Sequence, residues 1–278
     1  MKFAFSSNAF RNHSLKDASC AISAAGYTGI EIMCDTPHAY PANLTAADIQ
    51  TMRDDLVAKR LDIANLNAFM LCAIDDFHHP SWIEDDKDYR ELRIKHTLEC
   101  IDLAVHLGSR SISTEPGGPL NGISRKHALE LFIEGLSRVL PYAQENDIMI
   151  LIEPEPGLLI QNSEEFISLM KRLSHPCVGL NLDIGHVFCV GEDPVEKIIQ
   201  LKDYIHHFHL EDIPETREHK HLLLGEGAID IPKVLETIDS IGYNGYVTIE
   251  LYPYLQSAHE AARKAIEYIQ DICGYGKA

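Results

Sequence analysis

The sequence is poor in positive charge. Its 278 residues contain 24 Lys and Arg against 42 Asp and Glu, which gives a formal net charge of −18. A surface this negative repels both phosphate backbones and anionic lipid headgroups. We therefore expect no nucleic-acid partner and no membrane association, which leaves a small molecule as the expected binding partner.

Long apolar runs and paired cysteines are also lacking. The longest apolar runs, such as residues 148–152, span about five residues, whereas a membrane-spanning helix needs about 20. The first residues, Met1 to Ser6, lack the apolar stretch of a signal peptide. The seven cysteines form no CxxC pair and are odd in number, which is typical of reduced thiols. These features predict a soluble cytoplasmic protein.

No glycine-rich nucleotide-binding motif, GxGxxG or GxxxxGK[ST], occurs in the chain. Instead, short apolar runs typical of strands alternate with longer segments of helical period. The strand-like runs are residues 2–5, 29–33, 62–67, 109–114, 149–153, 179–183, 206–209 and 246–250. About 35 residues per strand–helix unit, with no Gly/Ser linker, match a (β/α)8 barrel. The predicted fold class is α/β, a single (β/α)8 TIM barrel forming one domain over residues 1–278, in preference to an open doubly wound sheet.

Capping residues indicate where several helices begin. Ser14 and Ser124 are predicted N-caps, and Thr45 with Asp48 resembles a capping box. Pro141 lies near the end of an apolar helical stripe, and we expect the helix to kink or break there because proline lacks the backbone donor.

Four of the predicted strands end on a potential metal ligand. These residues are Glu153, Asp183, His209 and Glu250, on strands five to eight. In a (β/α)8 barrel the C-terminal ends of the strands surround the active site, and alternation along each strand lets all four side chains point inward. Three carboxylates at a low-dielectric mouth repel one another unless a cation lies among them. We therefore predict one bound divalent metal ion. The oxygen-rich ligand set favours Mn²⁺ and also suits Mg²⁺, Co²⁺ or Zn²⁺.

Histidines gather in the second half of the chain, with seven of the 15 between residues 175 and 221. His186 follows Asp183 by three residues, so we expect it above the metal ligands, bonded to a substrate oxygen. His221 and Arg217 follow strand seven, and Glu115 follows strand four. We expect these three to orient distal hydroxyl groups of the substrate. Because few cations lie on the strand-end loops, an unphosphorylated sugar or polyol is favoured over a sugar phosphate.

Several motifs resemble the xylose isomerase-like TIM-barrel superfamily, the sugar phosphate isomerase/epimerase group. They are AGYTGIE at residues 25–31, DIGH at residues 183–186 and GEG at residues 225–227. The resemblance runs from Phe3 to Ile272, and the four strand-end ligands match the group's metal quartet by position. It implies a TIM barrel with metal-dependent sugar chemistry. The group contains ketose epimerases, hydroxypyruvate isomerases, inosose-processing enzymes and dehydratases. Such barrels often pair through their mouths or outer helices, so a homo-oligomer also fits the resemblance.

The predicted function is a divalent-metal-dependent sugar isomerase or epimerase acting on a hydroxy-carbonyl substrate, a ketose or a sugar-like polyol ketone. Glu153 and Glu250 are the predicted catalytic residues, which remove and return a proton through a metal-stabilised enediolate. The same enediolate gives dehydration when it loses a β-hydroxyl group. The alternative is therefore a metal-dependent lyase or dehydratase acting on a related sugar or cyclitol.

Two other functional classes stay open. An apurinic endonuclease-like phosphodiesterase needs a basic DNA-facing surface. It also needs histidines on strands three and four, where this sequence has Asn65, Asn67, Thr114 and Glu115. A non-catalytic sugar-binding subunit is expected to lack one of the two strand-end glutamates, and this sequence has both.

Overall fold

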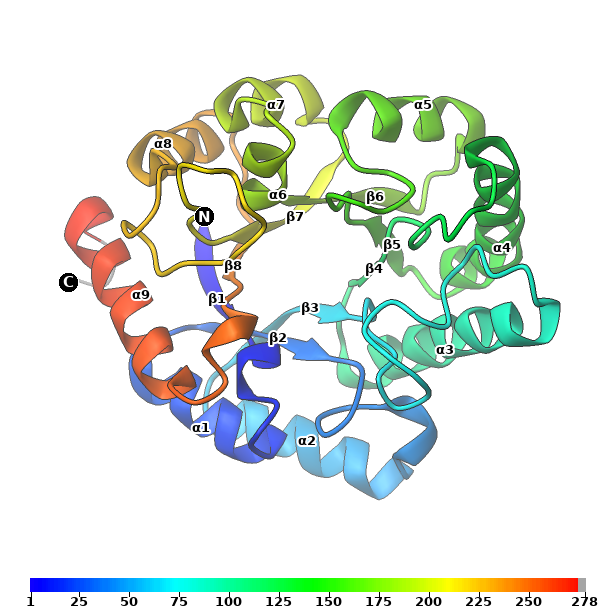
Figure 1. The fold of residues 1–278 in the computed structure, drawn as a ribbon. Coiled ribbons are helices and arrows are strands. Elements are labelled where there is room, and N and C mark those ends of the chain that lie inside the picture. The colour runs from blue at the N-terminus through cyan, green and yellow to red at the C-terminus, as the bar shows by residue number, and fades with distance from the viewer. Residues whose placement is uncertain (275–278) are drawn as a thin grey trace.

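The computed structural model describes residues 1–274 and contains a closed barrel of eight parallel strands surrounded by helices (Figure 1). Each strand pairs with the next along the chain, and β1 pairs with β8 to close the barrel. The strands are β1 (Lys2–Ser6), β2 (Gly29–Met33), β3 (Asp62–Asn67), β4 (Ser111–Thr114), β5 (Met149–Ile152), β6 (Val178–Asp183), β7 (Ile205–Leu210) and β8 (Tyr246–Ile249). The predicted (β/α)8 fold is confirmed.

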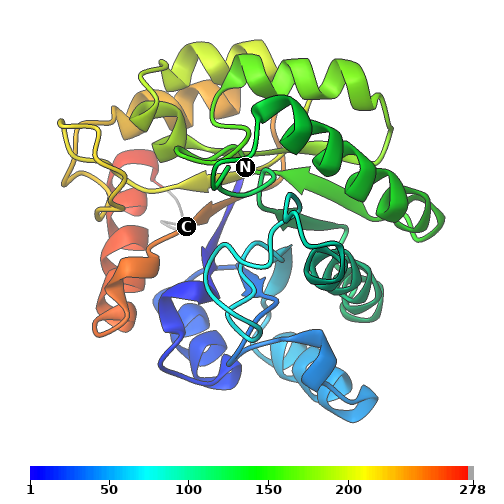
Figure 2. The same cartoon turned by 45° about the vertical axis from the view of Figure 1, so that its right-hand side comes forward.

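Helices follow the strands and form the outer layer, as Figures 1 and 2 show from two directions. Two helices follow β6. The short helix α6 begins directly after the strand at the barrel mouth, and α7 then lies in the outer ring of helices. The helices are α1 (Leu15–Ala25), α2 (Ala46–Ala58), α3 (Lys87–Leu107), α4 (Arg125–Glu145), α5 (Ser163–Leu173), α6 (Ile184–Cys189), α7 (Pro194–Leu201), α8 (Ile231–Ser240) and α9 (Ala258–Cys273). None of the helices in residues 1–274 combines the length and the hydropathy that crossing a bilayer requires.

The predicted capping residues begin helices as expected. Ser14 and Ser124 are the N-caps of α1 and α4, and Thr45 and Asp48 form a complete capping box at α2. Pro141 does not end α4, which continues to Glu145. The proline lies close to the C-terminal end, where its missing N–H removes one bond, and the buried residues around it keep the last turn packed on the barrel.

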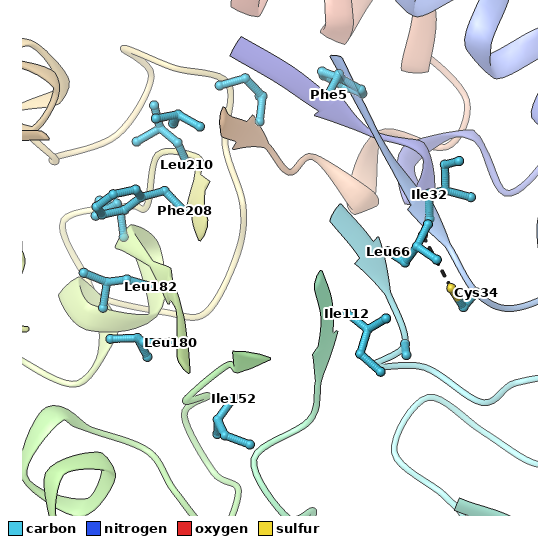
Figure 3. Close-up of a cluster of buried hydrophobic side chains, with 14 of the residues drawn as sticks. Phe5, Ile32, Cys34, Leu66, Ile112, Ile152, Leu180, Leu182, Phe208 and Leu210 are labelled. Carbon is cyan, nitrogen blue, oxygen red and sulfur yellow. Dashed lines mark hydrogen bonds between the residues drawn. The ribbon is translucent and has the colours of Figure 1, made fainter. Parts of the chain in front are cut away.

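Strand β7 illustrates how the barrel separates apolar from polar side chains. Phe208 and Leu210 are buried in the hydrophobic layer between the strands and the helices (Figure 3). The alternate residues, His207 and His209, face the barrel interior, where both lie close to Glu31 of β2. Because β2 and β7 are not neighbours in the sheet, this contact crosses the barrel. The upper interior of the barrel is therefore polar, and it leads into the mouth.

Candidate active site at the barrel mouth

The four strand-end side chains singled out by the sequence come together at the barrel mouth. Glu153 and Glu250 directly follow β5 and β8, Asp183 ends β6, and His209 lies in β7. All four are buried, and one potential ligand atom from each lies within 4.8 Å of those of the others. His209 Nδ1 is 2.9 Å from Glu153 Oε1, 3.6 Å from Glu250 Oε1 and 3.8 Å from Asp183 Oδ2. The imidazole therefore lies among three carboxylates.

The three carboxylates differ in how readily they ionise. Burial raises the pKa of Glu153, and it raises the pKa of Glu250 well above the ordinary value. Burial also opposes ionisation of Asp183, but the neighbouring imidazoles of His186 and His221 outweigh it and lower the pKa. Asp183 Oδ1 accepts a hydrogen bond from the backbone N–H of His186 at 2.6 Å, whereas Oδ2 is buried without a hydrogen-bond partner. A cation would satisfy this oxygen.

Two asparagines hold the glutamates in place. Asn181 Nδ2 donates to Glu153 Oε2 at 2.9 Å, and Asn8 Nδ2 donates to Glu250 Oε1 at 2.8 Å. Sequence reasoning missed both asparagines. Asn181 precedes Asp183 by two residues on β6, so its inward position was available from strand alternation. Asn8 lies in the short 3₁₀ helix after β1 and gave no comparable signal.

Glu31 of β2 is a further buried carboxylate that sequence reasoning did not assign to the site. Its Oε2 lies 2.9 Å from His209 Nε2 and 3.4 Å from His207 Nε2. Burial opposes its charge, but His209 and His207 together lower the pKa of Glu31 well below the ordinary value. The pKa of His209 is raised well above its ordinary value, although burial alone would lower it, because Glu153 and Glu31 flank the ring.

Three imidazoles form one group beside the carboxylates. His186 Nε2 lies 2.9 Å from His219 Nε2, which in turn lies 3.3 Å from His221 Nε2. His186 Nδ1 is 3.0 Å from the carbonyl oxygen of Pro154, and His221 Nδ1 is 2.9 Å from that of Glu250. Since a carbonyl only accepts, both Nδ1 atoms carry protons. Burial lowers the pKa of His186 to about 3 and that of His221 to about 4, so both rings are neutral at neutral pH.

Glu211 is a second buried carboxylate that sequence reasoning did not assign. Both of its oxygens are buried without hydrogen-bond partners, and ligand atoms of Glu211, Asp183 and His221 lie within 4.8 Å of one another. Burial and the neighbouring Asp183 raise the pKa of Glu211 well above the ordinary value. The carboxyl group occupies space beside Gly185, where any added Cβ would overlap Glu211 Oε1.

Two residues expected to orient the substrate lie apart from this group. The exposed Arg217 places its guanidinium on the Phe188 ring, 4.5 Å from the centroid, and donates to the carbonyl oxygen of Phe188 at 2.8 Å. Glu115 is fully buried beneath the mouth loops, where Oε1 accepts from the backbone N–H of Trp82 at 3.1 Å and lies 3.8 Å from Arg93 Nε. The structure does not bring either residue into contact with the quartet.

A narrow hollow with a cavity volume of about 30 Å³ opens above the quartet. Phe69, Met70, Phe77 and Tyr252 supply its apolar wall, and the polar lining contains no Lys or Arg. The polar residues are Asn8, Asn67, Glu153, Glu155, His186, His219 and Glu250. A wider and more open depression lies at the other end of the barrel, but none of the four quartet residues lines it. The hollow at the mouth, which Glu153 and Glu250 line, is therefore the candidate substrate site.

Comparison with known proteins agrees with this architecture. A family model described as xylose isomerase-like TIM barrel matches residues 21–272. An inosose dehydratase of Geobacillus thermodenitrificans (strain NG80-2) is 32% identical over 163 residues, covering 52% of this chain and 55% of that protein, or about half its length. A fructoselysine 3-epimerase of Shigella flexneri is 24% identical over 268 residues, covering 92% of this chain and 90% of that protein.

Among solved structures, a D-tagatose 3-epimerase-like protein shares the fold, with a TM-score of 0.81 at 24% sequence identity over 98% of each chain. The family model covers nearly all of the eight strand–helix units. The resemblance noted in the sequence motifs is thereby confirmed, and the chain belongs to the xylose isomerase-like TIM barrel family.

Proposed function

We propose that this protein is a divalent-metal-dependent isomerase or epimerase that moves a proton beside the carbonyl group of a sugar-like hydroxy-carbonyl substrate. The observation that carries the proposal is the buried convergence of Glu153, Asp183, His209 and Glu250 below the hollow at the mouth. Membership of a family whose relatives include a sugar epimerase and an inosose dehydratase supports the same chemical class.

The quartet fits a divalent cation on the chemistry of its donors. Three carboxylates and one imidazole form a hard, oxygen-rich set, and the buried Asp183 Oδ2 has no hydrogen-bond partner. This set favours Mn²⁺ and also suits Mg²⁺, Co²⁺ or Zn²⁺. When bound, the metal supplies a Lewis acid that polarises the substrate carbonyl and so acidifies the neighbouring C–H bond.

The two glutamates are the proposed catalytic residues that move the proton. Both line the hollow, and they reach it from β5 and β8, which are separated by two strands. Each has one oxygen held by an asparagine amide, so its orientation is set before a substrate arrives. The raised pKa of Glu250 suits a group that both accepts and donates a proton. Removal by one glutamate and return by the other at the opposite face gives epimerisation.

The histidines have separate proposed roles. His186 lines the hollow and is neutral, so we assign it to a hydrogen bond with a substrate oxygen. His219 lies beside it and lines the same hollow. His221 does not line the hollow; its Nδ1 donates to the carbonyl oxygen of Glu250, so it positions that glutamate instead.

The lining of the hollow supports one class of substrate. It contains Glu153, Glu155 and Glu250 and no Lys or Arg, so a phosphate or carboxylate group would find no cationic side chain to bind. Burial and the surrounding carboxylates raise the pKa of Glu155 well above its ordinary value, and a protonated Glu155 can donate to a hydroxyl oxygen. We therefore propose an unphosphorylated sugar or polyol ketone.

A dehydratase is the second candidate, because the Geobacillus relative is an inosose dehydratase. The same residues would act, with loss of a β-hydroxyl group following proton removal, and the product would be lighter by one water. The phosphodiesterase alternative gains no support from β3. Its inward-facing Asn65 and Asn67 both donate to Glu31.

The test is metal analysis of the purified protein, followed by Mn²⁺ addition with a panel of ketoses and polyol ketones in D₂O. We expect about one metal ion per chain, the number that a four-ligand site holds, and metal-dependent deuterium incorporation beside the carbonyl on NMR. Mass spectrometry separates epimerisation from loss of water. Absence of both metal binding and exchange would refute the proposal.

A further inference from the structure

We propose that Glu31 is a positioning residue that holds the His209 ring so that Nδ1 is the nitrogen presented to the three carboxylates of the quartet. The inference rests on the proposed metal-dependent function. It assigns to that site a fifth buried residue, which comes from β2 on the opposite side of the barrel.

The contacts of Glu31 identify it as an acceptor for surrounding donors. Its Oε2 lies 2.9 Å from His209 Nε2 and 2.9 Å from Asn65 Nδ2, and Oε1 lies 3.4 Å from Asn67 Nδ2. His207 Nε2 approaches the same carboxylate to 3.4 Å. The side chain is fully buried, so solvent does not supply these bonds. A carboxylate that is surrounded by donors is held in one orientation.

The asparagine amides are themselves oriented, which removes the ambiguity in their direction. Asn65 Oδ1 accepts from the hydroxyl of Ser111 at 2.7 Å, and Asn67 Oδ1 accepts from the backbone N–H of Phe69 at 3.0 Å. Both NH₂ groups must therefore face Glu31. Ligand atoms of Glu31, His207 and His209 also lie within 4.8 Å of one another. The amide donors occupy the lone pairs of Glu31, so this deeper group serves as a hydrogen-bond network and not as an ion site.

The tautomer of His209 follows from this network. A carboxylate only accepts, so His209 Nε2 carries a proton and donates it to Glu31. Nδ1 faces Glu153, Asp183 and Glu250, and in the metal-free protein it shares a proton with Glu153 Oε1 at 2.9 Å. Release of that proton would leave the Nδ1 lone pair to serve as the ligand. Metal-bound histidines usually donate their second ring N–H to such a partner, which fixes both the tautomer and the ring orientation.

The experiment compares metal affinity in the wild-type protein and in Glu31→Gln by competition of Mn²⁺ between the protein and a chelator. The substitution keeps the side-chain volume, but it replaces one carboxylate oxygen with an NH₂ group that would face the donors surrounding this position. We expect Mn²⁺ affinity to fall about 10–100-fold, the range found when such outer partners are lost. At saturating Mn²⁺ we expect kcat to recover most of its wild-type value, because the quartet itself is intact.

The matched control is Asp35→Asn, at another buried carboxylate. The Asp35 side chain accepts from the backbone N–H groups of Thr36, Cys72 and Ala73 and does not line the hollow. This variant is expected to lose stability while it keeps wild-type metal affinity. Unchanged Mn²⁺ affinity in Glu31→Gln would overturn the positioning role. Failure of the wild type to bind any metal would instead overturn the proposed function.

A measurement on the wild type covers the case in which Glu31→Gln does not fold. NMR of the ¹⁵N-labelled, Zn²⁺-loaded protein reports which ring nitrogen of His209 carries the proton. We expect the proton on Nε2, in slow exchange with solvent because the site is buried. A proton on Nδ1, with zinc on Nε2, would contradict the inference whatever the variant does.

Discussion

Burial of the Glu115 carboxyl group beneath the mouth predicts a specific dependence of the unfolding free energy on pH. Glu115 is fully buried, with Oε1 bonded to the backbone N–H of Trp82 and Oε2 without a hydrogen-bond partner. Burial raises its pKa from the ordinary value of 4.5 to about 7, although Arg93 acts in the opposite direction. The folded protein therefore favours the protonated form of this side chain.

The sign of the pH dependence follows from this preference. As the pH rises from about 4.5 through about 7, the unfolded chain releases the Glu115 proton first, so wild-type stability falls. The difference between pKa values of 4.5 and about 7 corresponds to about 3 kcal/mol of unfolding free energy. Glu115→Gln removes the ionisation and keeps an acceptor for Trp82. We expect it to match the wild type at about pH 4 and to be more stable by up to about 3 kcal/mol at about pH 8.

The assay is urea denaturation of the metal-free wild type and Glu115→Gln at both pH values. The other titrating groups are common to the two proteins, so their contribution cancels in the difference. A difference in unfolding free energy that does not change with pH would refute the reasoning. Turnover supplies a second measurement. Glu115 does not line the hollow, so kcat and KM should stay unchanged. A raised KM would restore the sequence-based assignment of Glu115 to the substrate.

Four further predictions concern the site and its surroundings. Glu250→Gln should keep the fold and lower substrate deuterium exchange by about 10²–10⁴-fold on NMR, and undiminished exchange would exclude Glu250 from proton transfer. Chelation should lower the Tm more at neutral than at acidic pH in scanning calorimetry. The pKa values of Glu153 and Glu250 are raised, so at low pH protons occupy these carboxylates and less metal is bound. Equal falls in Tm at the two pH values would contradict this account. Arg217→Ala should leave KM nearly unchanged, because its side chain packs on Phe188 outside the hollow; a large rise in steady-state KM would show that this loop rearranges on binding. Gly185→Ala should destabilise the protein in urea, because its Cβ would overlap Glu211, and adding Glu211→Ala should recover most of the loss.

The four quartet residues were predictable because the information that places them is local. Side chains alternate along a strand, so a residue two positions beyond an inward-facing residue also faces inward. The C-terminal ends of the strands in a closed barrel meet at one mouth, which brings consecutive strand ends together. The repeat of strand and helix signals predicts the barrel itself. Glu153, Asp183, His209 and Glu250 therefore followed from spacing and residue type before any coordinates were known.

The residues that contact this quartet could be identified only from the tertiary structure. Glu31 and His209 are 178 residues apart, and Asn8 and Glu250 are 242 residues apart. Alternation predicts that such side chains face inward, but strand register and barrel closure decide which of them meet. The sequence therefore gave no reason to connect Glu31 with His209, because their contact depends on how β2 and β7 face each other across the barrel.

Arg217 and Glu115 show that a strand-end position in the sequence does not by itself place a side chain in the site. Both have the charge and the strand-end position of substrate contacts, but loop paths turn Arg217 toward Phe188 and bury Glu115 beside Trp82. The sequence by itself determined the barrel, through short-range periodicity, and the residue types at the ends of its strands. Only the tertiary structure decided which polar side chains orient those residues and which loop residues reach the hollow, because these contacts depend on closure of the whole barrel.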